Sequence, residues 1–122
     1  MLLDGAHNPA GAAALATSLE DLGVRRPTIV FGAMRTKRVA AVLRALAPLD
    51  PHFVFTRVED PGAHDPSTLA RSWRRISGRR ARRAPNPAAA MAVADGDPVV
   101  VAGSLYLVGA VRGMLTGTGE EA

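Results

Sequence analysis

Three short apolar runs recur along the chain, each four residues long and rich in β-branched or aromatic side chains. They occupy residues 28–31, 53–56 and 99–102, and each begins one or two residues after a proline. Apolar runs of this length between chain-breaking residues are typical of strands buried on both faces of a parallel sheet. Residues 1–3 resemble the end of another such strand, and residues 79–83 predict a polar edge strand.

Helical periodicity fills the segments between these runs. Apolar residues recur three or four positions apart in four sets: Leu15, Leu19, Leu22; Val39, Val42, Leu43, Leu46; Leu69, Trp73, Ile76; and Leu107, Val108, Val111, Leu115. Asn8 and Asn86 each precede a proline, which is how many helices begin, and Gly23 suits a helix end. The alternation predicts one Rossmann-like α/β domain, a mostly parallel sheet with helices on both faces. We expect it to span residues 1–115, with residues 116–122 as a flexible tail.

Composition narrows the class of protein. The chain has 122 residues, 48% of them hydrophobic and 21% charged, which fits one globular domain. The absence of cysteine excludes disulfides and thiolate metal sites, and the three histidines lack metal-binding spacing, so no metal site is predicted. No apolar run approaches the roughly 18 residues of a membrane span. The start of the chain lacks the regions of a signal peptide, so we expect a cytoplasmic protein with no membrane partner.

Arginine dominates the charge. Fifteen basic residues against eleven acidic ones give a formal net charge of +4, and Lys37 is the only lysine. Seven arginines fall within residues 71–83: Arg71, Arg74, Arg75, Arg79, Arg80, Arg82 and Arg83. Such a run is usually a solvated surface, and the alternative is a docking surface for an acidic partner or nucleic acid. Because Trp73 is the only aromatic residue there, base stacking is unsupported and no nucleic-acid partner is predicted.

Candidate chemistry follows the first and last predicted strands, in a class of sheet that binds ligands at the carboxyl ends of its strands. Residues 4–9 form a glycine-containing turn with a carboxylate, Asp4, and an imidazole, His7, just before a helix. Ser104 follows the last strand, where its hydroxyl can cap its own helix or donate to a carboxylate. The alternatives are that Asp4 braces a turn, that His7 is a surface histidine and that Ser104 is only a cap.

The loop at residues 32–38 brings three cations to the next helix start: Arg35, Lys37 and Arg38. The chain contains neither G-x-x-x-x-G-K-[ST] nor G-x-G-x-x-G, so it has no phosphate-cradling P-loop and is not a dinucleotide oxidoreductase. We expect four side chains to gather along one edge of the sheet, away from the arginine run: Asp4, His7, Lys37 and Ser104.

Three motifs carry a resemblance to a known family. LLDGAHNP at residues 2–9 resembles the motif that opens the C-terminal domain of folylpolyglutamate and dihydrofolate synthases, ADP-forming amide ligases of the Mur ligase superfamily. VFGAM at residues 30–34, with Lys37, resembles the second-strand signature of that family. VVVAGSLYLVG at residues 99–109 resembles its last strand and helix, so the three motifs cover essentially the whole chain in the family's order.

The resemblance implies a reaction in which ATP phosphorylates a folate or dihydropteroate carboxyl and the amine of L-glutamate attacks the acyl phosphate. Magnesium ions bridge the nucleotide phosphates. By position, Asp4 would bind ATP through the ribose, and His7 would be catalytic, near the reacting phosphate and the glutamate. Ser104 would bind the glutamate carboxylate together with His7, and Lys37 would contact a phosphate or its own loop.

Two departures from the family shape the expectation. Thr36 and Arg38 flank Lys37 where the family usually has acidic residues, and neither the ATPase half nor its ATP-binding arginine is present in the 122 residues. We therefore expect the C-terminal domain of a ligase that is inactive alone, with ATP and Mg²⁺ held mainly by an N-terminal ATPase domain. The alternative is a stand-alone, non-catalytic binding module that retains the fold. The choice between a folate and a dihydropteroate substrate stays open.

Overall fold

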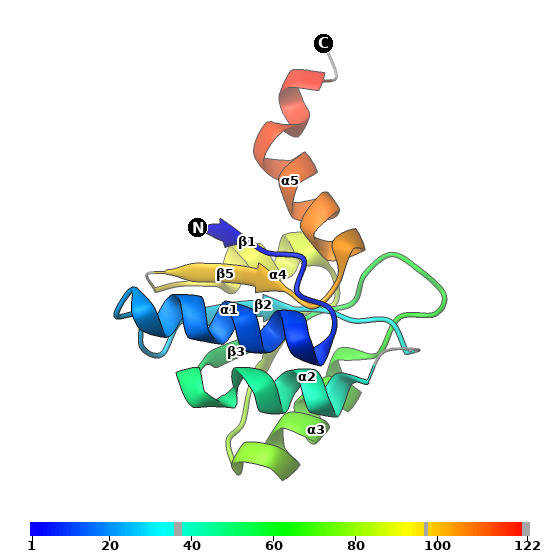
Figure 1. Ribbon diagram of the computed structural model, residues 1–122. Coiled ribbons are helices and arrows are strands. Elements are labelled where there is room, and N and C mark those ends of the chain that lie inside the picture. Colours follow the sequence, from blue (N-terminus) through cyan, green and yellow to red (C-terminus); the bar gives the residue numbers. More distant parts are fainter. Residues whose placement is uncertain (36–37, 97, 121–122) are drawn as a thin grey trace.

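A five-stranded parallel sheet forms the centre of the molecule in a computed structural model, which describes residues 1–35, 38–96 and 98–120 (Figure 1). The strand order is β1-β5-β2-β3-β4, and each neighbouring pair is parallel. The strands are β1 (Leu2–Leu3), β2 (Thr28–Phe31), β3 (His52–Phe55), β4 (Arg82–Arg83) and β5 (Val99–Ala102). The predicted Rossmann-like α/β class is confirmed.

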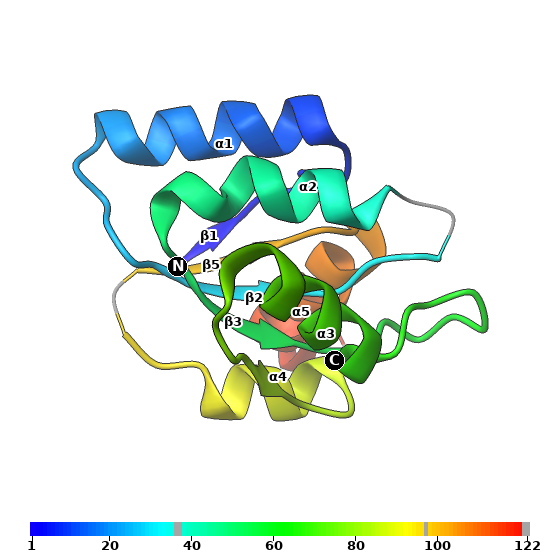
Figure 2. The same ribbon diagram turned by 90° about the horizontal axis from the view of Figure 1, so that it is seen from below.

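Helices cover both faces of the sheet, with α1, α2 and α3 packed on one face and α4 and α5 on the other. Figure 2 shows α1 and α2 across the strands from α4. Their bounds are α1 (Pro9–Asp21), α2 (Val39–Leu46), α3 (Pro66–Ser77), α4 (Pro87–Val93) and α5 (Leu105–Glu120), with a 3₁₀ turn at Ala47–Leu49. The two predicted asparagine caps are confirmed, because Asn8 Oδ1 accepts from Gly11 N–H at 2.7 Å and Asn86 Oδ1 accepts from Ala89 N–H at 2.8 Å.

Alternate side chains of the central strands fill two separate cores, because successive residues of a strand point to opposite faces. On the α1–α3 face, Phe53 stacks on Phe55 with ring centroids 4.7 Å apart, and Trp73 meets Phe53 edge-on at 4.7 Å. On the α4–α5 face, Val54 and the other inward valines pack beneath Leu107 of α5. Burial on both faces explains why these strands read as uninterrupted apolar runs.

Element boundaries differ from the sequence-based expectation at three places. The strand predicted over residues 53–56 is β3, one residue earlier, and the edge strand predicted over residues 79–83 is reduced to β4. Helix α5 continues to Glu120 instead of ending at residue 115, and it projects beyond the sheet (Figure 1). Leu115, on the same helical stripe as buried residues, is therefore 59% exposed. The flexibility of residues 116–122 stays a prediction, and residues 121–122 lie outside the described part of the chain.

Candidate functional site

The turn after β1 fixes both of its candidate side chains through the backbone. Asp4 Oδ1 accepts from Ala6 N–H at 2.8 Å, while Asp4 N–H donates to Val101 O at 2.9 Å and so extends the β1–β5 pairing. His7 Nδ1 lies 2.7 Å from Gly5 O. Because a carbonyl oxygen only accepts, Nδ1 is the donor in this contact, and the tautomer with its proton on Nδ1 has an acceptor at Nε2. The turn therefore presents a carboxylate and a proton acceptor.

Ser104 begins α5 and is almost fully buried, at 4% exposure. Its Oγ accepts from Tyr106 N–H at 3.1 Å, and its carbonyl oxygen accepts from Val108 N–H at 3.1 Å, so it is the N-cap of the helix. A hydroxyl has two lone pairs and one proton, and the cap uses only a lone pair. Ser104 is thus a helix cap, one of its two predicted roles, and its O–H still has a proton to donate. Its contact with a carboxylate stays a prediction.

Three loops meet at the carboxyl edge of the sheet. Gly103 N–H donates to Ala6 O at 2.8 Å, which joins the loop after β5 to the turn after β1. Gly5 lies directly against the side chain of Leu105. A Cβ on Gly103 would lie 2.5 Å from Gly32 O, so the loop after β2 touches the same point. The strand order thus brings segments about a hundred residues apart into one site.

The structure therefore places three of the four predicted side chains, Asp4, His7 and Ser104, on adjoining loops at one edge. Lys37 lies outside the described residues. The rest of its loop is held by Arg35 N–H, which donates to Gly62 O at 2.8 Å, and by His64 N–H, which donates to Ala33 O at 2.9 Å.

The chemistry of this edge suits a small anion. The amino ends of α1 and α5 both lie here, and the positive end of a helix dipole favours negative charge. Ser104 adds a hydroxyl donor, and His7 adds an imidazole nitrogen. Among residues 1–35, 38–96 and 98–120, no three His, Cys, Asp or Glu side chains come together as a metal site. Nor is any helix in that part of the chain long and apolar enough to cross a membrane.

One polar residue at this edge, Thr56, was not predicted as a site residue. Thr56 follows β3, is fully buried, and its Oγ1 has no hydrogen-bond partner among the described residues. Its carbonyl oxygen lies 3.2 Å from where a Cβ on Gly32 would stand, which places Thr56 beside the loop after β2. The sequence offers one sign of this group, a hydroxyl at the end of the apolar run at residues 53–56. That run was interpreted as a strand that includes Thr56.

His64 supplies a pH-dependent contribution to stability. Partial burial lowers the pKa of His64 below its ordinary value of 6.5, and the neighbouring Arg35 lowers it further. Folding therefore favours neutral His64, so the contribution of His64 to the free energy of unfolding is fully present above about pH 6.5 and is lost as the pH falls through the lowered pKa. We expect His64→Gln to flatten this slope, measured as urea midpoints between about pH 5 and 7.5. His52→Gln, at an exposed histidine, is the matched control for the substitution itself. Equal flattening of the slope in both variants would contradict the role of His64.

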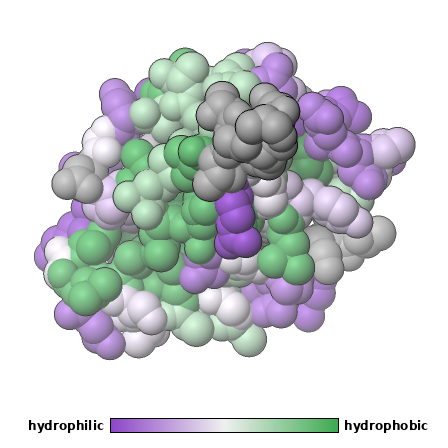
Figure 3. All heavy atoms as spheres, turned by 90° about the horizontal axis from the view of Figure 1, so that it is seen from above, coloured by the Kyte–Doolittle hydropathy of each residue, from purple (hydrophilic) through white to green (hydrophobic). Residues whose placement is uncertain are grey.

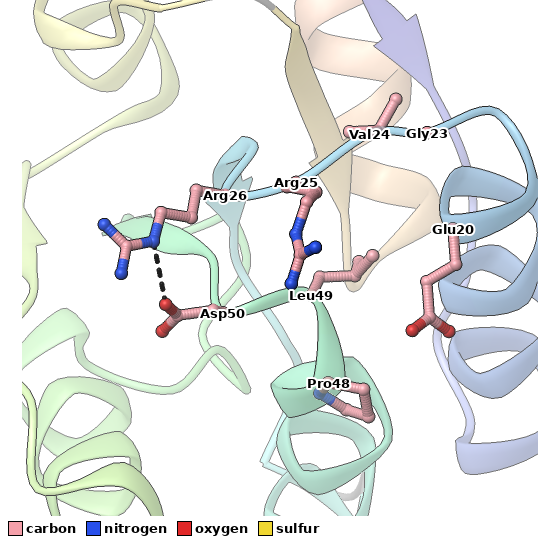
Figure 4. A pocket seen from close by; sticks show the side chains of 8 residues that line it. All are labelled: Glu20, Gly23, Val24, Arg25, Arg26, Pro48, Leu49 and Asp50. Carbon is pink, nitrogen blue, oxygen red and sulfur yellow. Dashed lines mark hydrogen bonds and ion pairs between the residues drawn. The ribbon is translucent and has the colours of Figure 1, made fainter.

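The opposite end of the sheet carries separate features. A hollow of about 340 Å³ lies between the segments that precede β2 and β3, with Glu20 and Arg25 in its lining. In the same lining, Arg26 Nε donates to Asp50 Oδ2 at 3.0 Å, a contact drawn as a dashed line in Figure 4. None of the predicted site residues lines this hollow. The arginine run lies along α3 and β4, and β4 is the outer strand on the side of the sheet opposite β1. That the run lies away from the carboxyl edge stays a prediction.

The fold and the three loops define a Rossmann-like α/β domain with a candidate anion-binding edge. The family model described as "Mur ligase, glutamate ligase domain" matches residues 1–105. The chain belongs to that family, which confirms the resemblance carried by the sequence motifs.

Similar proteins are folate-related ligases. A probable bifunctional folylpolyglutamate synthase/dihydropteroate synthase of Haloferax volcanii is 34% identical over 117 residues, 92% of this chain and 14% of that protein. A folylpolyglutamate synthase of Mycobacterium tuberculosis, solved with ADP and AMPPCP, aligns with a TM-score of 0.82 and 34% identity over 91% of this chain and 28% of that one. The Thermotoga maritima folylpolyglutamate synthase aligns with a TM-score of 0.81 and 32% identity, over 93% and 27%. The chain thus spans a minor part of each relative.

Proposed function

We propose that this chain is the glutamate-binding C-terminal domain of an ATP-dependent amide ligase that adds L-glutamate to a folate or dihydropteroate carboxyl. One observation carries the proposal: the buried cap Ser104 stands at the amino end of α5, and Gly103 beside it is hydrogen-bonded to the turn that holds His7. Membership in the glutamate ligase domain family and the similar synthases support the same reaction class.

Each site residue has a proposed task. The Ser104 hydroxyl and the positive end of α5 bind a carboxylate of the incoming glutamate. His7 accepts a hydrogen bond from the glutamate amine at Nε2, which orients that nitrogen toward the activated carboxyl. Asp4, whose Oδ1 is held by Ala6 N–H, accepts from the ribose hydroxyls of ATP. Lys37 contacts a nucleotide phosphate or its own loop.

ATP and a divalent metal are part of the proposal because similar proteins were solved with nucleotides and a metal ion. The Mycobacterium synthase was solved with ADP and AMPPCP. A bifunctional folylpolyglutamate synthase/dihydrofolate synthase of Yersinia pestis, 25% identical to this chain, was solved with AMPPNP and manganese. The 122 residues contain no P-loop sequence, and their described part holds no metal-ligand cluster. We therefore assign the phosphates and Mg²⁺ mainly to a separate N-terminal ATPase domain, the proposed partner of this one.

An exposed apolar surface beside the site supports docking of such a domain. Figure 3 shows apolar residues gathered on the face from which α5 projects. Large apolar side chains stay exposed at the amino end of β1 and on the first turn of α5: Met1, Leu2, Leu105 and Tyr106. Leu105 and Tyr106 are 65% and 64% exposed directly next to Ser104, a position where a second domain would close over bound glutamate.

Substitution of Ser104 by alanine tests the glutamate site. We expect the 122-residue chain to bind L-glutamate with a Kd on the order of millimolar, and Ser104→Ala to weaken binding about fivefold or more, because one donor to the carboxylate is lost. The measurement is an NMR titration that follows amides of residues 103–108.

Asn86→Ala is the matched control, since it also removes an N-cap but lies on α4, away from the site. Both variants should lose about 1 kcal/mol of stability, and only Ser104→Ala should lose glutamate. Equal weakening by the two variants, or none by Ser104→Ala, would contradict the assignment.

A further inference from the structure

A second charged surface lies beside β4, the outer strand on the side of the sheet opposite β1. A hollow of about 390 Å³ opens between α3 and the segment around β4. Four exposed arginines line it, two from α3 and two from the β4 segment: Arg71, Arg74, Arg80 and Arg83. The other lining residues are small, namely Ser67, Ala70 and Ala81, so the guanidinium groups border an open space. We call this hollow and its four arginines the basic groove.

The described part of the chain does not neutralise the basic groove. Two neighbouring arginines of the same run are paired: Arg79 with Asp50 at 3.2 Å and Arg82 with Asp95 at 3.0 Å. No carboxylate lies within ion-pair distance of the four groove arginines in the part of the chain that the structure describes. Like charges around one hollow repel each other, so an entering anion relieves that repulsion as well as gaining its own contacts.

Ordinary structural roles account for only part of the groove. Arg74 lies in the last turn of α3, where a cation stabilises the helix end. Arg83 lies on the edge strand β4, where charge discourages aggregation. Arg71 is in the middle of α3 and Arg80 precedes β4, so neither role applies to them. Their convergence on the same hollow is what points to a ligand.

We propose that the basic groove binds an extended acidic peptide segment, rich in Asp and Glu, of a partner protein. The planar fork of arginine matches a carboxylate with two parallel hydrogen bonds. β4 pairs with β3 on one side and ends the sheet, so an extended chain has an open strand edge to lie along. The basic groove lies beside β4, whereas His7 and Ser104 follow β1 and β5 on the other side of the sheet. The proposal therefore does not depend on the proposed glutamate ligation.

Nucleic acid fits the groove less well. Single-stranded nucleic acids bind by stacking their bases on aromatic side chains. No aromatic residue lines the hollow, and Trp73 of α3 is only 1% exposed. Duplex affinity comes mainly from contacts to many phosphates spread along the backbone, and four arginines around one small hollow reach only a few of them. An acidic peptide needs only a few carboxylates.

The test measures fluorescence anisotropy of a labelled Glu/Asp-rich dodecapeptide with the 122-residue chain at about 50 mM salt, where charge contacts are weakly screened. We expect a Kd of about 10–100 µM that weakens as salt rises, and no binding of the matching Gln/Asn peptide. The triple variant Arg71→Gln, Arg74→Gln and Arg80→Gln should bind about thirtyfold more weakly.

The matched control removes the same net charge from exposed arginines elsewhere: Arg25→Gln, Arg38→Gln and Arg44→Gln. It should weaken binding less than about threefold, because only long-range attraction changes. If circular dichroism shows that the triple variant of the groove does not fold, two other measurements test the proposal. They are peptide binding by Arg80→Gln alone and the NMR shifts that the peptide induces at the amides of Ala70 and Ala81. No binding, equal losses in both triples, shifts elsewhere, or tighter binding of an oligonucleotide that competes with the peptide would overturn the proposal.

Discussion

Gly103→Ala should lower the free energy of unfolding by about 3–5 kcal/mol, because two penalties act at one position. Gly103 has a φ of 105°, a conformation that side chains rarely adopt. An added Cβ would also lie 2.5 Å from Gly32 O and 2.7 Å from the Phe31 ring, and both neighbours are buried. Neither the backbone oxygen nor the ring can move without disturbing the sheet. The measurement is urea unfolding followed by circular dichroism.

Gly109→Ala is the control for this prediction. Gly109 lies within α5, and an added Cβ would meet no atom within 4 Å. The same chemical change should therefore stabilise the protein by about 0.5–1 kcal/mol, through the better helix propensity of alanine. If Gly103→Ala proved as harmless as Gly109→Ala, the close contact between the loops after β2 and β5 would be wrong. The proposed site would then lose its geometry.

The 122-residue chain should release no ADP above background from ATP, Mg²⁺, L-glutamate and either dihydropteroate or tetrahydrofolate. Phosphoryl transfer depends almost wholly on positioning and on stabilising charge at the phosphates. The chain has no P-loop sequence and its described part has no metal-ligand cluster. We therefore expect the 122 residues to supply neither contribution. The fold should persist, because both cores lie within the domain. A coupled assay for ADP release measures the outcome.

A chimera supplies the positive control. Residues 1–115 would replace the matching domain of the Mycobacterium tuberculosis synthase, which aligns with this chain over 28% of its length. Turnover should return in the chimera, His7→Ala should lower it by about a hundredfold, and Asn86→Ala should leave it unchanged. Steady turnover by the 122-residue chain would contradict the proposed division of labour. A silent chimera whose isolated domain still binds glutamate would favour the stand-alone binding module.

Local sequence patterns were sufficient for the elements and their class. Four-residue apolar runs gave β2 and β5 with correct bounds, and the Asn-Pro pairs marked the starts of α1 and α4. These features depend on side-chain periodicity and backbone preference, which act over a few residues. Family motifs, read by resemblance, indicated the ligase class. The end of β3 and the shortening of β4 were missed because pairing with neighbouring strands decides where a strand stops.

Local patterns in the sequence thus account for the elements, the caps and the three polar loops, apart from the bounds of β3 and β4. The position of β5 between β1 and β2 follows from the folded sheet alone, and it brings the turn of His7 against the loop of Ser104. The tertiary structure also decided that Arg71 and Arg80 share one hollow. Strand order depends on which distant segments bury most apolar surface together, and no local pattern encodes it. The exposure of Leu115 has the same origin, since the periodicity is correct but the sheet ends before the helix does.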